Sequence, residues 1–322
     1  MDAKITKKRI GILLSYDWIK IVGLAVGAIL FWSLIFTMTA TRITPAQQFT
    51  VFNYYCNTPL SNKFYTQYNS FAQNKIFSYE VIETNTNDLT TGGEEYYITL
   101  LEARLGTDEG DILFVPDIPD PSSKQTAEDG TESYAYTYSE AFYSRFFQYT
   151  YDVDKYLADM ADYLNQFYGD YKTGTLDEKK AEDDFVARIT RNKDKRYKKD
   201  EDIQQGKKDA VERLKKYRDG LIKLQNYIDE GIILLEKREV KDAEGKTVIS
   251  GNYAVDICPD ENVMGNLKEY FSYREPVEDD YRQTAKNMQV YFLKTPNMEE
   301  SFQYESVLYL VHLLDASYTP NA

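Results

Sequence analysis

Aromatic, amide and carboxylate side chains stand at the ends of the first strand-like segments of this chain. Such groups can hold a ligand without breaking a bond, because tyrosine rings stack on sugars and peptides while polar groups hydrogen-bond to them. Each position also fits ordinary turn chemistry, since Asn and Asp commonly end strands. We predict six ligand-binding residues at these strand ends: Tyr54, Tyr55, Asn57, Asn85, Asn87 and Asp117.

Three predicted strands bring these positions together. Residues 48–56 (QFTVFNYYC) alternate aromatic and β-branched residues, 78–83 (SYEVIE) form a second strand, and 111–115 (DILFV) form a third. Helices are expected between them over 61–74 and 94–105. Helical crossovers of this kind require parallel strands with helices on the faces of the sheet. Ligands bind beyond the carboxyl ends of such strands.

The remainder of the chain alternates between helical and strand patterns, which favours an α/β fold. We find no internal repeat in it. The pattern predicts a polar loop over 120–133 and then a largely helical stretch. Its helices are expected over 139–168, with a break near Asp152, and over 209–235, and residues 170–202 between them form an exposed helix or a mobile excursion. After it, the pattern predicts a hairpin over 239–250, strands over 252–258 and 286–293, and a final helix over 298–314.

A long apolar run near the N-terminus predicts a membrane anchor. No charged residue occurs from Ile21 to Ala40, and twenty helical residues span about 30 Å, the thickness of a bilayer core. The basic residues before it keep residues 1–20 in the cytoplasm and place the rest of the chain outside, in a single-pass arrangement. A cleaved signal peptide is the alternative, although its apolar core is usually shorter, and residues 37–40 match a cleavage site poorly.

Charge and motif content exclude several classes of function. The net charge of −14 argues against nucleic acid as a partner. One basic tract, Arg191–Lys199 (RNKDKRYKK), is either a solvated surface or a docking site. Phosphate-binding loops, nucleophile elbows and zinc-protease motifs are absent, so we predict no enzymatic activity and no cofactor. His312 is the single histidine and is expected on a helix packing surface, which leaves no metal site.

Two cysteines, Cys56 and Cys258, are too few for a disulfide framework. Both would face an oxidising compartment if the anchor places the domain outside. One structural disulfide between them and two buried thiols both remain open.

Three blocks of the sequence resemble extracellular solute-binding proteins of bacterial ABC transporters, of the family 1 type. The blocks are LLEARLGTDEGDILFVPD, NYAVDIC and QVYFLKTPNMEESFQYESVLYLVHLL. The resemblance implies a type II periplasmic-binding-protein-like fold of two lobes with a helical insertion. On this basis residues 41–120 form an α/β lobe, 121–250 a helical, charge-rich second lobe or insertion, and 251–322 return to the first lobe.

The resemblance implies a membrane-anchored, extracytoplasmic solute-binding protein. Its ligand would be a sugar or a peptide, delivered to a membrane permease of an ABC transporter. The chain is shorter than typical members, has a membrane helix in place of a lipid-modified cysteine, and carries a charged helical middle. The alternative is therefore a non-catalytic scaffold of the cell envelope, in which a degenerate binding-protein fold uses residues 139–235 to dock another envelope protein.

Overall fold

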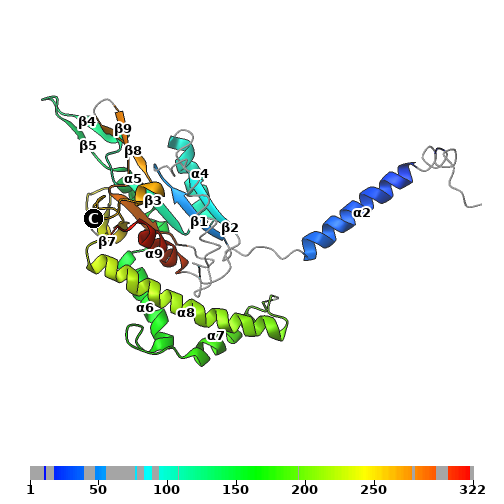
Figure 1. The fold of residues 1–322 in the computed structure, drawn as a ribbon. Helices are drawn as coiled ribbons and strands as arrows, with labels where there is room; N and C mark the ends of the chain where they lie inside the picture. Colours follow the sequence, from blue (N-terminus) through cyan, green and yellow to red (C-terminus); the bar gives the residue numbers. More distant parts are fainter. Residues whose placement is uncertain are drawn as a thin grey trace, which may run out of the picture. The chain divides into compact units, whose positions relative to one another are not determined.

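A computed structural model describes residues 11, 18–39, 48–55, 77, 83–88, 94–107, 109–194, 196–277, 280–294 and 304–319 (Figure 1). The chain divides into two compact units, residues 1–44 and residues 45–322.

The first unit contains one long apolar helix, α2 (Trp18–Thr39). It is long and apolar enough to cross a membrane, or to act as a signal sequence, and its described side chains are exposed. Residues 21–39 of the predicted membrane segment are therefore helical, and the helix begins three residues earlier than expected, at Trp18.

The second unit is built on a six-stranded mixed sheet with the order β2-β1-β3-β10-β7-β6. The first three strands are parallel to one another, as predicted from the helical crossovers. Strand β10 is antiparallel to both β3 and β7, and β6 is antiparallel to β7. The strands are β1 (Gln48–Asn53), β2 (Glu83–Asp88), β3 (Ile112–Pro116), β6 (Leu234–Lys241), β7 (Thr247–Asp256) and β10 (Met288–Phe292).

Helices cover both faces of this sheet because apolar side chains alternate along its central strands. On β3, Ile112 and Phe114 face one hydrophobic cluster, and Leu113 and Val115 face the other. The first cluster includes α6 (Val153–Tyr168), α8 (Asp200–Asp229) and α9 (Glu305–Ser317), and the second includes α4 (Glu94–Gly106) and α5 (Tyr138–Phe146) (Figure 1).

The second strand extends further along the chain than predicted. We expected it over 78–83, of which only Glu83 lies among the described residues, and β2 runs from Glu83 to Asp88. As an edge strand, β2 pairs only with β1 among the described strands, so backbone hydrogen bonds suffice and the polar sequence ETNTND is tolerated.

Two helix predictions had different outcomes. The break near Asp152 is confirmed, because its side chain accepts a hydrogen bond from Lys155 N at 3.0 Å and caps α6. The helix predicted over 209–235 is wrong at both ends. Helix α8 starts nine residues earlier, at Asp200, and stops at Asp229, after which the chain turns through Gly231 into β6.

Residues 170–202 contain helix α7 (Glu178–Arg191) and the start of α8, so the exposed-helix prediction is correct for this part. The predicted loop 120–133 holds a small hairpin, β4 (Lys124–Thr126) with β5 (Glu132–Tyr134). The other short elements are a hairpin of β8 (Tyr273–Val277) with β9 (Asp280–Thr284), and 3-10 turns at Pro121–Ser123, Phe147–Tyr149 and Leu267–Glu269.

The helical segment packs directly on the sheet. Tyr217 and Leu221 of α8 and Met160 of α6 are buried in the same cluster as Val255 of β7. The observed fold is therefore mixed α/β within one compact unit, residues 45–322, and a division into two lobes stays a prediction.

Candidate ligand-binding site

A partly buried ion pair lies just beyond the carboxyl end of β3. Arg238 Nη2 of β6 is 3.0 Å from Asp117 Oδ2, and the side chain of Arg238 is only 9% exposed. Asp117 also accepts hydrogen bonds from Gln289 Nε2 at 2.8 Å and from the hydroxyl of Thr137. The predicted site residue Asp117 is thus drawn into a network with strands that lie far away in the sequence.

The network continues through neutral partners on α5 and β10. Ser139 Oγ donates to Gln289 Oε1 at 2.6 Å and lies 2.7 Å from the hydroxyl of Tyr291. Arg238 donates to that hydroxyl through Nε at 3.2 Å, and through Nη2 to Ser139 Oγ at 3.2 Å and to Gln289 Oε1. Because each buried polar group finds a partner, these residues form a rigid floor at this edge of the sheet.

A second carboxylate, Asp256 at the end of β7, lies close to this floor. Burial raises the pKa of Asp256 to about 6, against the hydrogen bond from Cys258 N, and the charges of Glu236 and Asp117 raise it further. Arg238 opposes this rise. The charge of the Arg238 guanidinium therefore lowers the pKa of Asp256, while the guanidinium forms a direct ion pair with Asp117.

An open groove of about 820 Å³ borders this floor at Arg238, which is among its lining residues. Tyr54, from the end of β1, and Tyr143, from α5, are buried in its wall, whereas Tyr136 is 41% exposed. The groove is also lined by seven charged side chains: Asp120, Glu140, Arg145, Lys237, Arg238, Glu239 and Lys241.

Most of these charges are already engaged within the fold. Glu140 closes the capping box of α5 with Thr137, and Asp120 accepts a hydrogen bond from Ser122 N at 2.8 Å. Arg145 and Lys241 are exposed, and no ion pair joins either of them to a carboxylate in the described ranges. The groove therefore offers tyrosine rings together with two available cations.

The two predicted tyrosines have different positions. The ring of Tyr54 packs 5.8 Å from Phe142 and lines the groove. Tyr55 has a left-handed backbone (φ 55°), and its ring stacks on Tyr138 at 4.0 Å without lining the groove. Tyr54 thus lies where a ligand-binding residue was expected, and Tyr55 supports the start of α5.

The predicted asparagines are not all at strand ends. Asn85 and Asn87 lie inside β2 and not beyond it, because the strand is shifted toward the C-terminus. Asn57 and Cys56 lie outside the described residues. Cys258 is fully buried after β7, so the proposed disulfide with Cys56 stays a prediction.

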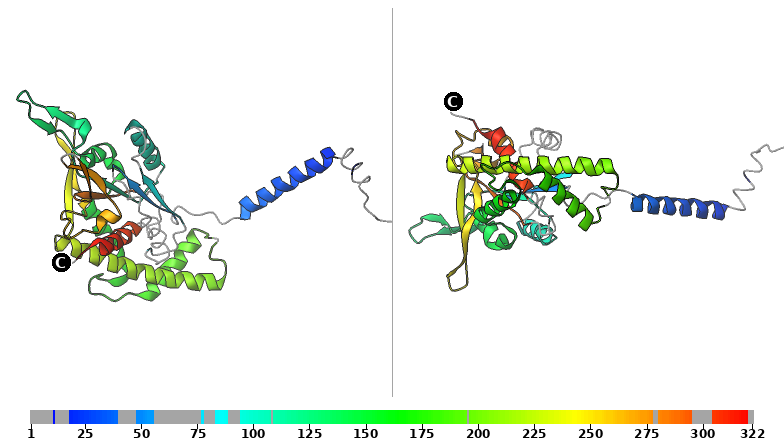
Figure 2. Two further views of the ribbon diagram at one scale, coloured as in Figure 1. Left: turned by 45° about the horizontal axis from the view of Figure 1, so that its top comes forward. Right: turned by 90° about the horizontal axis from the view of Figure 1, so that it is seen from below.

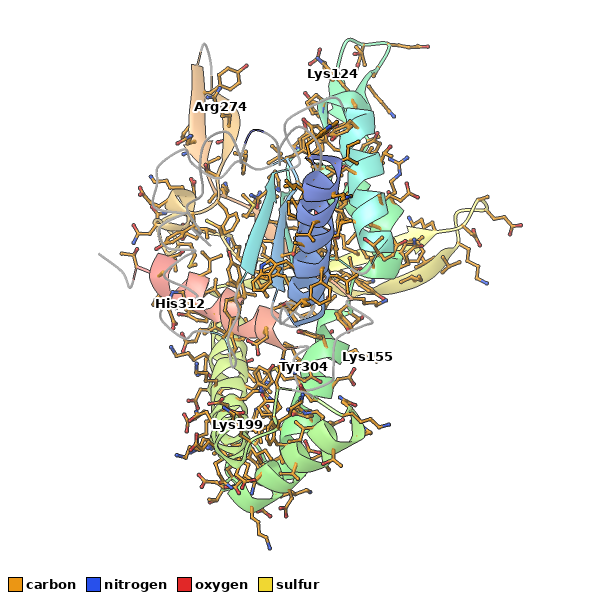
Figure 3. The ribbon with its side chains drawn as sticks, turned by 90° about the vertical axis from the view of Figure 1, so that its right-hand side faces the viewer. Lys124, Lys155, Lys199, Arg274, Tyr304 and His312 are labelled. Atoms are coloured by element: carbon orange, nitrogen blue, oxygen red, sulfur yellow. The ribbon has the colours of Figure 1, made fainter. Side chains whose placement is uncertain are left out.

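Sequence reasoning missed Arg238, Gln289 and Arg145. The signal for Arg238 was a charged residue that shares a strand face with Val240, but the segment was assigned partly to a helix. Among the described residues no cluster of three potential metal ligands occurs. His312 is half-buried on α9 (Figure 3), where burial lowers its pKa, and it lies outside the groove lining.

No protein-family model, curated protein or solved structure matches this chain. The function is therefore inferred from the groove. Its tyrosines and its two available cations are suited to bind a ligand with a flat or apolar face and an anionic or hydroxyl-bearing end.

Proposed function

We propose that this protein is a membrane-anchored, extracytoplasmic binding protein that holds a sugar or a short peptide in the groove beside α5. The observation that carries the proposal is the meeting of Tyr54, Tyr136 and Tyr143 with Arg145 and Lys241 in one cavity of about 820 Å³. A volume of this size fits a ligand of two or three sugar rings or residues.

The lining favours a ligand that carries a carboxylate. Tyr136 offers an exposed ring for stacking, and Arg145 offers a guanidinium that can hold a carboxylate through two hydrogen bonds. A uronic-acid sugar and the C-terminal end of a peptide both have this chemistry. Neutral sugars would use the ring alone and bind more weakly.

The anchor supports a role next to a permease. A binding domain held by α2 stays within reach of a membrane partner, which raises its effective concentration there. We infer further that the fold is a reduced type II binding-protein fold, in which α6, α7 and α8 replace the second lobe. The three parallel strands with helices on both faces are compatible with this.

One observation favours the alternative of a non-catalytic envelope scaffold. Asp117, at the predicted ligand edge, is fully engaged by Thr137, Arg238 and Gln289. Strand-end groups that satisfy one another are expected of a fold that has lost its ligand. Whether the groove beside them binds a ligand distinguishes the two functions.

The test is thermal unfolding of the full chain in nanodiscs with three probes: trigalacturonate, maltotriose and trialanine. At about a hundred times its dissociation constant, a bound probe adds about 2.7 kcal/mol, which raises the midpoint by roughly 5 °C. We expect trigalacturonate or trialanine to give this rise and maltotriose a smaller one.

Two tyrosines provide a matched control. Tyr136 lines the groove and Tyr134, two residues earlier, does not, although both are exposed. Tyr136→Ala should weaken probe binding about tenfold or more through lost stacking, and Tyr134→Ala should leave it unchanged. If no probe raises the midpoint of the wild-type chain, the binding proposal fails and the scaffold function is favoured.

A further inference from the structure

The turn between α7 and α8 carries a dense run of cations. Arg191–Lys199 contains six basic residues and one acidic residue in a chain of net charge −14. Arg196 pairs with the single acidic residue, Asp194, at 2.5 Å. Four of the cations are exposed, and in the part of the chain that the structure describes no carboxylate pairs with them: Arg191, Lys193, Lys198 and Lys199.

This basic tip is an ordered structure with a small core of its own. Phe185 and Ile189 of α7 pack with Ala210 of α8, and the ring of Tyr197 meets Phe185 edge-on at 4.9 Å. The exposed cations are therefore held on a hairpin end that has a fixed shape.

Three contacts locate the tip at the edge where the parallel strands begin. Ser306 Oγ of α9 donates to the carbonyl oxygen of Asp111, just before β3, at 3.1 Å. Tyr217 of α8 donates to Glu305 Oε1 at 2.8 Å, so the middle of α8 lies beside the same edge. Further along, Lys223 binds Asp315, which means that α8 and α9 run in the same direction.

The half of α8 before Tyr217 therefore extends past this edge. From Asp200 to Tyr217 the helix is about 26 Å long. Figures 1 and 2 show the N-terminal end of α8 on the side where β1 starts, and the β4–β5 hairpin on the opposite side. In Figure 3, Lys199 lies far from Lys124 and Arg274, which are on the β4–β5 and β8–β9 hairpins.

The anchor joins the domain at this same edge. The backbone N–H of Thr50 donates to Asp111 Oδ2 at 2.7 Å, so the start of β1 lies beside the start of β3. Nine residue steps separate Thr39 of α2 from Gln48, and a fully extended chain would cover about 32 Å over that distance. The projecting half of α8 has nearly the same length as this linker at full extension, so the linker does not prevent the tip from contacting the bilayer.

We propose that the basic tip binds anionic phospholipid headgroups of the membrane that holds α2. Four exposed cations on an ordered hairpin complement a negatively charged surface, and each adds attraction that salt weakens. Bound in this way, the domain would hold its amino edge toward the bilayer and its groove away from it. The inference rests on the membrane anchor of the proposed function, but not on the groove or its ligand.

The test uses the full chain in nanodiscs of phosphatidylcholine alone or with about a third phosphatidylglycerol. Backbone hydrogen exchange of residues 188–203 is measured in both. We expect exchange to be at least about threefold slower with the anionic lipid, and this protection to disappear in about 1 M NaCl.

Two charge variants make the result specific. The tip variant Arg191→Gln, Lys193→Gln, Lys198→Gln and Lys199→Gln should lose the protection. A control with four exposed cations changed elsewhere should keep it: Lys124→Gln, Lys268→Gln, Arg274→Gln and Lys286→Gln. Equal exchange in the two lipids, or equal loss in the two variants, overturns the proposal. A chain that fails to co-elute with nanodiscs would instead refute the anchor, and soluble trigalacturonate binding would be unaffected by either result.

Discussion

Each edge of the central sheet holds a carboxylate, and the two carboxylates lie in different surroundings. At the carboxyl edge Asp117 is 22% exposed and is paired directly with Arg238 at 3.0 Å. At the amino edge Asp111 is 7% exposed and lies near a second carboxylate, Glu305. Burial raises the pKa of Asp111 to about 7, although the hydrogen bond from Thr50 N favours the ionised form.

The two edges of the sheet therefore differ in how their acidic groups are stabilised. At the carboxyl edge the guanidinium of Arg238 gives Asp117 a direct partner, which suits an edge that borders a groove. A dry carboxyl near neutral pKa is protonated in mild acid, which makes the stability of the amino edge depend on pH. Asp256 at the carboxyl edge and Asp111 at the amino edge both have a raised pKa, so the stability of both edges is expected to depend on pH, in windows that end near pH 6 and near pH 7.

The largest effect is expected at the carboxyl edge. Replacing Arg238 with Met leaves Asp117, Gln289 and Tyr291 without their shared donor, and breaking a buried pair on one side costs about 3–5 kcal/mol. Urea unfolding of the full chain in a non-ionic detergent measures the loss. The neighbouring Lys237→Met is the control, because Lys237 is 65% exposed in its pair with Glu239 and should cost less than about 1 kcal/mol.

A double variant distinguishes the loss of the ion pair from the loss of side-chain packing. If the cost arises from an unpaired charge, Asp117→Asn in the Arg238→Met background should recover part of the stability. Equal losses for Arg238→Met and Lys237→Met would show that the network does not hold the edge together.

The second effect concerns the pH dependence of the amino edge. The folded state holds the proton of Asp111 up to about pH 7, whereas the unfolded chain releases it near the ordinary value of 3.8. Stability should therefore fall as the pH rises from about 4 to about 7, by on the order of 3–4 kcal/mol, and then level off.

Asp111→Asn imitates the protonated carboxyl and can still accept the hydrogen bond from Thr50. This variant should be more stable than the wild type at about pH 8 and equally stable at about pH 4. Asp162→Asn, at an exposed position on α6, is the control and should change neither value. Parallel stability curves for the wild type and Asp111→Asn would contradict the assignment.

The parts of the fold that follow local patterns were predictable. Continuous apolar residues identified β3, and a capping aspartate marked the break at Asp152. The end of strand β2 was placed too early because an edge strand needs no apolar stripe. The start of strand β6 was missed because Leu235 continued the helical spacing of α8.

The site was predictable only in part, for a related reason. Asp117 was found because the carboxyl ends of parallel strands meet at one edge. Its partners Arg238 and Gln289 lie 121 and 172 residues further along the chain. They come from antiparallel strands that no local pattern places beside β3, so the ion pair and the groove required the structure.

The smallest effect is expected at the basic tip and is confined to it. A Cβ at Gly206 would lie 2.2 Å from Phe185 Cζ and 2.7 Å from Tyr197 Cε1, the two rings that order the tip. Alanine normally favours a helix over glycine by about 1 kcal/mol, but overpacking here should produce a net loss of about 1–2 kcal/mol. Hydrogen exchange should accelerate in residues 185–206 and not in β3 or β10. Gly106→Ala at the end of α4 is the control, since no heavy atom lies within 4 Å of its Cβ position. Faster hydrogen exchange throughout the sheet would mean that the tip unfolds together with both edges of the sheet and is not a separate unit.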